Sequence, residues 1–207
     1  ELDMDRTITV IGCGAAYATP DSVVINGQVI GTSNDYSEAV RASAEALSSL
    51  RKSIGEAGFD MDDLKTTSFS VDTVYRNGAS GDMEFSGYRY MHGISITTEA
   101  QGDSLGKLLQ ALTSCEGAPE FRVSYIVSDP TEPMRQARAA AVKDAKHRAR
   151  ELAAAADVKL GDIVSISYAS EGGAPVPRAR MMAAMAVDAV PRDQEFRDSV
   201  TIQWEII

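Results

Sequence analysis

One long segment of the chain restricts its fold more than any other, because it carries small residues at helical spacing along its whole length. It runs from residue 129 or 131 to residue 157, and apolar residues recur in it at steps of three and four. The predicted buried face consists of Met134, Ala137, Ala141, Ala145, Ala149, Leu152 and Ala156. Alanine allows close backbone approach, so we expect this helix to lie tightly on a sheet or on another helix.

Two further segments also have helical periodicity. Asp35 is a predicted N-cap, with Glu38 completing a capping box, and Gly58 occupies the expected left-handed stop. The apolar stripe between them consists of Tyr36, Val40, Ala44, Leu47, Leu50, Ile54 and Ala57. The other helix begins near Asp103 and carries Leu105, Leu108, Leu109, Leu112 and Cys115 on one face.

The remaining regular segments alternate apolar and polar residues, as half-buried strands do. They lie near residues 7–11, 23–30, 68–75, 88–96, 121–127, 163–168 and 196–206. We expect the first two to form a hairpin around the Pro20-Asp21 turn. The order ββαββαβαββ predicts an α+β fold in which mostly antiparallel sheets from paired strands pack with three helices. We expect a single domain over residues 1–207, with intertwined halves at 5–98 and 99–207.

Composition excludes several classes of protein. The chain has 20 Lys plus Arg against 30 Asp plus Glu, a net charge of −10, which opposes sequence-independent binding of nucleic acid. No apolar run approaches the roughly 20 residues of a membrane-spanning helix. The two cysteines, Cys13 and Cys115, favour free thiols over a single bridge.

The first six residues lack the basic-then-apolar pattern of a signal peptide. If Met4 is the native start, we expect a cytoplasmic protein. The alternative is a periplasmic or other extracytoplasmic location after removal of a signal.

Catalytic motifs are missing from the sequence. Gly12-x-Gly14 follows a strand, but Tyr17 stands at the third glycine position and another strand follows, so we reject a dinucleotide site. No phosphate-binding loop, HExxH, GxSxG or EF-hand loop occurs. We therefore predict no catalytic residue, no cofactor and no metal site.

The two histidines have ordinary structural explanations. His92 shares a strand face with Tyr88 and Tyr90, which favours a hydrogen-bonded core or subunit-contact histidine over a ligand or base. His147 lies among charged residues and is expected to be solvated. A small-ligand or catalytic site near Tyr88–His92 stays as an alternative.

Two groups of residues are candidate partner contacts. The long helix carries Arg135, Arg138, Lys143, Lys146, Arg148 and Arg150, which form either a docking stripe or, more simply, a solvated face. Arg138, Lys146 and Arg150 are the contact residues that we select from it. Met181, Met182 and Met185 fit an adaptable apolar contact surface, a Cu(I) site or a target of oxidants, and the first is favoured.

Six sequence patterns in order make the chain resemble the SIMPL-domain family. They are Arg6-Thr7-Ile8-Thr9-Val10 with Gly12-x-Gly14 and Pro20-Asp21; Asp62-Asp63-Leu64-Lys65-Thr66-Thr67-x-Phe69; Gly87-Tyr88-Arg89; Ser128-Asp129-Pro130 with Ala137-Arg138, Ala141-Val142-x-Asp144-Ala145 and Ala149-x-x-Leu152-Ala153; Val158-x-Leu160-Gly161-x-Ile163-x-Ser165-Ile166; and Phe196 with Trp204-Glu205-Ile206. This family of bacterial and archaeal proteins, including periplasmic immunogenic proteins, is long described as a domain of unknown function. The resemblance implies stress-related or envelope roles and self-association, and it supplies no catalytic residue.

Three functional hypotheses follow. The first is a non-enzymatic, self-assembling protein, since unguarded strand edges pair readily with other copies. The second is an adaptor that binds a protein partner through the basic face of the long helix. The third is a small-ligand protein or enzyme with its site near Tyr88–His92.

Overall fold

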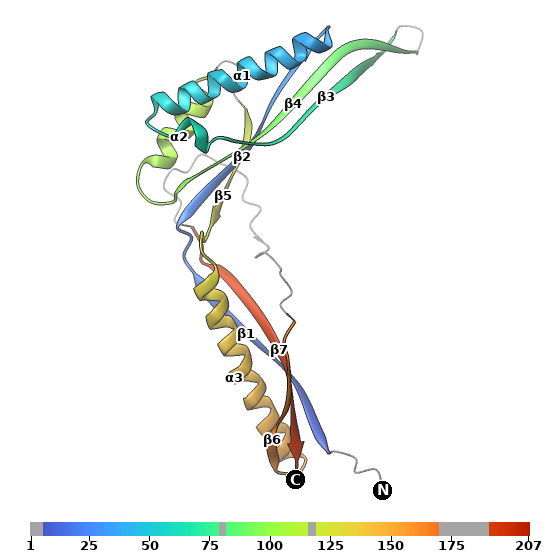
Figure 1. The fold of residues 1–207 in the computed structure, drawn as a ribbon, viewed down its shortest axis with the longest axis vertical. Coiled ribbons are helices and arrows are strands. Elements are labelled where there is room, and N and C mark those ends of the chain that lie inside the picture. The colour runs from blue at the N-terminus through green and yellow to red at the C-terminus, as the bar shows by residue number, and fades with distance from the viewer. Residues whose placement is uncertain (1–5, 79–81, 116–118, 170–190) are drawn as a thin grey trace. The chain divides into compact units, whose positions relative to one another are not determined.

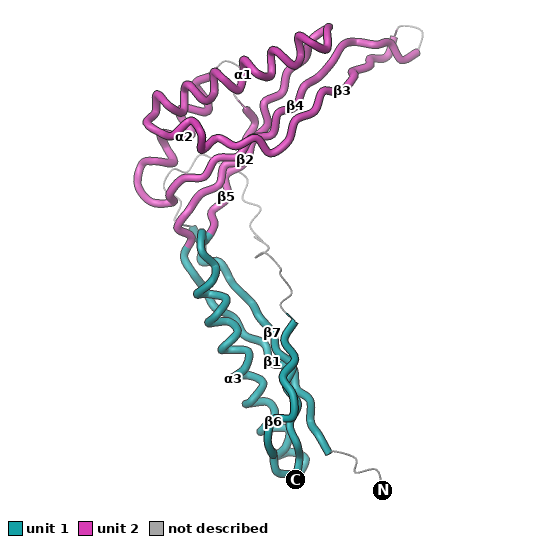
Figure 2. The backbone as a smooth tube through the Cα atoms, in the orientation of Figure 1, with its two compact units in different colours: residues 1–19, 127–181, 191–207 teal, residues 20–126, 182–190 magenta. Residues whose placement is uncertain are grey.

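The computed structural model describes residues 6–78, 82–115, 119–169 and 191–207. Within these ranges it contains three α-helices and seven strands in two antiparallel sheets, which confirms the predicted α+β class and element order (Figure 1). Two compact units divide the chain, as Figure 2 shows: residues 1–19, 127–181 and 191–207 form unit 1, and residues 20–126 and 182–190 form unit 2. The assignment of one domain over residues 1–207, with intertwined halves at 5–98 and 99–207, stays a prediction.

Unit 1 is a three-stranded sheet with one helix on it. The strand order is β1 (Thr7–Ala18), β7 (Gln194–Ile206), β6 (Leu160–Ser167), and α3 (Thr131–Ala155) lies along β1 and β7. β1 pairs with β7 from Thr7 opposite Glu205 to Ala18 opposite Gln194. The expected hairpin of β1 with the next strand is therefore wrong, because the long C-terminal strand takes the pairing partner's place.

The buried ridge of α3 follows every fourth residue. Its members are Pro133, Ala137, Ala141, Ala145, Ala149 and Ala153. Such an i, i+4 row is inclined to the helix axis, and it follows the sheet below because sheets are themselves twisted. The predicted buried face is wrong at its C-terminal end, where Leu152 is 51% exposed and Ala153 is buried in its place.

Two glycines of β1 explain how closely α3 lies on the sheet. A Cβ atom on Gly12 would collide with the carbonyl oxygen of Ala141, and one on Gly14 with that of Ala137. The Gly12-x-Gly14 pattern is thus a packing site for a helix, and no helix N-terminus follows it to hold a phosphate.

Unit 2 is a four-stranded antiparallel sheet covered by two helices. The strand order is β3 (Lys65–Asn77), β4 (Met83–Glu99), β2 (Ser22–Ser33), β5 (Glu120–Ile126). The helices are α1 (Tyr36–Glu56) and α2 (Ser104–Thr113), with a short 3-10 turn, η1 (Met61–Asp63), after α1. Their shared core includes Val23, Ile25, Leu50, Ile54, Leu108 and Leu112.

Helix α1 begins and ends where the sequence predicts. The Asp35 carboxylate accepts the Glu38 N–H at 3.0 Å, while Glu38 accepts from the Ser33 hydroxyl, so only half of the capping box forms. Gly58 has φ 91°, the expected left-handed stop. The predicted stripe is wrong in the first two turns, where Ala39 and Ser43 are buried and Val40 is partly exposed.

Candidate functional site

An open groove lies between α1 and β3, and both apolar and polar side chains line it. It has a volume of about 370 Å³. Six of its lining residues come from one side of α1 and two from the sheet: Val40, Ser43, Ala44, Leu47, Ser48, Arg51, Phe69 and His92. Because α1 packs mainly over β2 and β4, the neighbouring strand β3 is left incompletely covered.

His92 lies at the base of this groove, with both ring nitrogens hydrogen-bonded. Its Nδ1 lies 3.0 Å from the Ser43 hydroxyl and its Nε2 lies 2.9 Å from the Thr66 hydroxyl. The residue is 8% exposed, and its ring packs against Phe69 with centroids 5.4 Å apart. The sequence prediction of a buried, hydrogen-bonded histidine is confirmed.

The surroundings of His92 favour its neutral form. Burial lowers the pKa of this imidazole from its ordinary value, and the positive charge of Arg51 lowers it further. A neutral ring has one N–H, so it donates to one hydroxyl and accepts from the other.

The line of Ser43, His92 and Thr66 differs from a nucleophilic triad in two ways. Ser43 is 1% exposed, and a threonine hydroxyl stands where a carboxylate would stabilise an imidazolium. The arrangement is therefore a hydrogen-bonded connection between α1, β3 and β4.

Arg51 is the second unusual residue of the groove. Its Nε atom is buried without a hydrogen-bond partner, and Arg51 makes no ion pair within the part of the chain that the structure describes. Arg51 was not among the residues predicted from the sequence. Its position continues the helical spacing of Val40, Ala44 and Leu47, and a charged residue on such a stripe is the signal that could have identified it.

The two tyrosines that were expected beside His92 do not line the groove. Tyr90 is buried, and its ring lies over Gly31 of the neighbouring strand β2. Tyr88 makes edge contacts with Tyr36 and Phe85, at centroid distances of 5.6 and 5.3 Å. Of the expected Tyr88–His92 site, only His92 reaches the groove.

The basic side chains of α3 divide into paired and unpaired groups. Arg138 contacts Asp198 at 3.2 Å and lies over the Tyr168 ring, while Arg135 and Arg148 pair with acidic residues of their own helix. Lys146 and Arg150 are exposed and form no ion pair with any described residue. His147 is exposed beside Glu151, as predicted.

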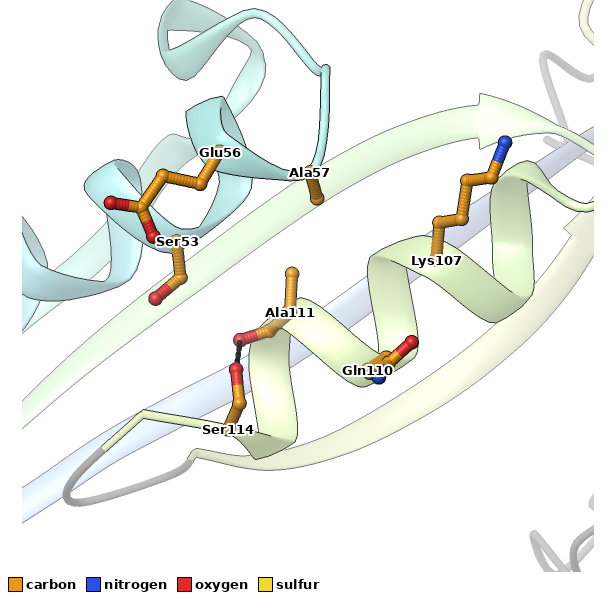
Figure 3. A pocket seen from close by; sticks show the side chains of 7 residues that line it. All are labelled: Ser53, Glu56, Ala57, Lys107, Gln110, Ala111 and Ser114. Carbon is orange, nitrogen blue, oxygen red and sulfur yellow. Dashed lines mark hydrogen bonds between the residues drawn. The ribbon is translucent and has the colours of Figure 1, made fainter.

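A second hollow lies between the C-terminal end of α1 and helix α2, and it has a volume of about 320 Å³ (Figure 3). The Ser114 hydroxyl in it is bonded to the Ala111 carbonyl at 3.1 Å. Lys107 pairs with Asp103, and Glu56 with Lys52. The charged groups of this hollow are therefore occupied in ion pairs at the surface, and they do not converge on a shared point.

Other predicted features have these outcomes. Met181, Met182 and Met185, like Met4, lie outside the described residues. No group of three or more metal-ligating side chains occurs in the described ranges, and none of their helices is long and apolar enough to cross a membrane. Cys13 and Cys115 are both free.

Comparison with known proteins gives one consistent result. The model of the SIMPL family, described as a protein of unknown function (DUF541), matches residues 8–204. The 26 kDa periplasmic immunogenic protein of Brucella melitensis is 27% identical, over 96% of this chain and 84% of its own length. The uncharacterized protein YggE of Escherichia coli is 29% identical, over 99% of this chain and 82% of its own.

Proposed function

The chain belongs to the SIMPL (DUF541) family, whose function is unknown, and we propose that it is a non-enzymatic protein that self-assembles through the open edge of β6. This strand is the outer member of its sheet, so one row of its backbone N–H and C=O groups has no strand beside it within the described residues. An edge of this kind is a template for pairing with another chain.

The side chains of β6 add an apolar surface to that edge. Ile163, Val164 and Ile166 are 43%, 48% and 58% exposed, and Asp162 is the strand's one charged residue. Two register shifts against β7 lie between Leu160 and Ile163 and between Ile163 and Ser165. The neighbouring residues Ile163 and Val164 point to opposite faces of the strand, so apolar surface is exposed on both. Burial of this surface against a second copy would stabilise a dimer or a larger assembly.

The opposite edge of the same sheet is guarded, which distinguishes β6 from it. On β1, the Cys13 N–H donates to the Asp144 carboxylate of α3 at 2.9 Å, and Arg148 holds that carboxylate at 2.9 Å. The hydrogen bond from the Cys13 N–H is the largest effect that lowers the pKa of Asp144 below its ordinary value, and the hydrogen bond and charge of Arg148 lower it further. The carboxylate therefore stays charged. A charged group at a strand edge opposes pairing with another strand.

Sedimentation velocity at micromolar concentrations tests this proposal. We expect the wild-type protein to sediment as a species larger than a monomer, and Ile163→Lys or Ile166→Lys to shift it toward the monomer. Leu152→Lys is the matched control, because the exposure of Leu152, 51%, lies between those of Ile163 and Ile166, and Leu152 is on α3 and at no strand edge. A wild-type monomer, or lysine variants that associate as the wild type does, would overturn the proposal.

We also propose an extracytoplasmic location, supported by the relative whose name describes it as periplasmic. Nothing in the comparisons supports the cytoplasmic expectation. Fractionation of cells that express the protein from its native gene tests this, and we expect to detect the protein in the periplasmic fraction. The stress- or envelope-related role stays a prediction, tested by the growth of a deletion strain under oxidant and detergent stress.

The adaptor hypothesis is the second candidate, and the unpaired cations of α3 favour it. Lys146 and Arg150 are exposed without acidic partners among the described residues, on a chain with a net charge of −10. Arg138, by contrast, forms an ion pair with Asp198 within unit 1. If these two residues bind an acidic partner, Lys146→Glu with Arg150→Glu abolishes its co-purification. Lys52→Glu on α1 is the control, and equal capture by both variants would contradict the adaptor role.

A further inference from the structure

We propose that the groove between α1 and β3 binds an unbranched aliphatic carboxylate, with its alkyl chain along α1 and its carboxylate at Arg51. This binding site is separate from the assembly surface on β6.

The walls of the groove fit an extended apolar chain. Val40, Ala44 and Leu47 follow one another at steps of four and three on one side of α1, and Phe69 faces them from β3. From Val40 to Arg51 the helix rises about 16 Å, from eleven residues at roughly 1.5 Å each. Val40 and Phe69 are 37% and 47% exposed, so a ligand there would cover apolar surface that is open to water.

Arg51 supplies charge complementarity at one end of this line. Its guanidinium has no acidic partner among the described residues, and its buried Nε–H has no hydrogen-bond acceptor among them either. An unsatisfied buried donor costs free energy, and a carboxylate is the acceptor that matches the planar guanidinium, with two parallel hydrogen bonds. Acidic residues outnumber basic ones in this chain, yet none of the described ones pairs with Arg51, so its guanidinium is available to the carboxylate of a ligand.

The rest of the lining favours a single negative charge on the ligand. No lysine and no second arginine lines the groove, and His92 contributes no charge in its neutral form. Both nitrogens of His92 are already bonded to hydroxyl groups, so they do not compete for the carboxylate. One cation above an apolar wall matches a monocarboxylate better than a phosphate dianion.

Isothermal titration calorimetry with decanoate, below its micelle concentration at pH 7, tests the site. Decanol has a similar alkyl chain without the charge, and we expect it to bind at least tenfold more weakly. Arg51→Gln should reduce decanoate affinity at least tenfold and leave decanol binding unchanged. Lys52→Gln, which removes a neighbouring cation from outside the groove, should leave both affinities unchanged.

Position and folding are checked in the same samples. Decanoate should shift the amide resonances of Ser43 and His92, and the thermal melt of Arg51→Gln should remain cooperative. Absence of decanoate binding, equal affinity for decanol, or unchanged affinity in Arg51→Gln would each overturn the proposal. Affinity lost equally in Lys52→Gln would also overturn it, because attraction would then be a general effect of positive charge on α1.

Discussion

At the scale of single residues, His92 connects three elements of unit 2 through two hydroxyl groups. Ser43 on α1 and Thr66 on β3 lie on either side of the ring, and His92 itself belongs to β4. Because the folded protein favours neutral imidazole, protonation opposes the fold. The histidine therefore makes the stability of unit 2 dependent on pH.

Stability should fall as the pH falls through 6.5, the ordinary pKa of histidine, toward the lowered pKa of His92. Between these two pKa values His92 binds a proton in the unfolded chain but not in the folded one, so the free energy of unfolding of the protein decreases. Urea unfolding at several pH values checks this. His92→Gln should flatten the dependence and His147→Gln, at an exposed site, should retain it; equal slopes in all three proteins would contradict the assignment.

The sequence predicted the burial of His92 but could not identify its neighbours. Alternation along β4 is a local signal, and it places His92 on the same face as Tyr90 and Ile94. Thr66 and Arg51 reach the same region only through the pairing of β3 with β4 and the placement of α1. Those contacts depend on residues far apart in the sequence, and no spacing encodes them.

At the scale of elements, helices and strands were predicted well because their signals are local, whereas their pairing was not. The capping residue Asp35 and the stop at Gly58 both lie within a turn of the helix that they bound. The expected hairpin of β1 and β2 failed because β1 pairs with a strand at the other end of the chain. Leu152 was misplaced for a related reason, since the inclination of the buried ridge of α3 depends on the sheet below it.

The edge of β1 gives a prediction for an element. Asp144→Ala removes the acceptor of the Cys13 N–H and the partner of Arg148. We expect faster hydrogen exchange at the Cys13 amide and stronger self-association, because the edge loses its charged guard. Sedimentation and amide exchange check both effects, with Glu132→Ala, which breaks an ion pair within α3, as the control. Unchanged exchange at Cys13 would show that Asp144 does not protect this edge.

At the scale of the whole molecule, each unit has a hydrophobic core of its own. Val10, Ala145, Val200, Ile202 and Trp204 belong to the cluster of unit 1, while the cluster of unit 2 draws on both of its helices and its sheet. We therefore expect a change in one core to act on that unit alone.

Gly14→Ala tests this independence. The added methyl group would collide with the backbone of α3, and overpacking of this kind costs about 1–3 kcal/mol. Hydrogen exchange should accelerate in β1, β7 and α3 and remain unchanged in α1, β2 and β4. Ala15→Ser, on the exposed side of the same strand, is the control. Uniform acceleration in both units would mean that they unfold as one.

The pairing of β1 with β7 has a consequence for biosynthesis. All of unit 2's described elements lie between these two strands in the sequence, so unit 2 can fold during synthesis, before the pairing partner of β1 has been made. The first strand remains unpaired until residues 194–206 have been made, and its apolar residues are open to chaperones during that time. Vectorial synthesis thus sets the order in which the two units mature, with the N-terminal strand among the last elements to find its place.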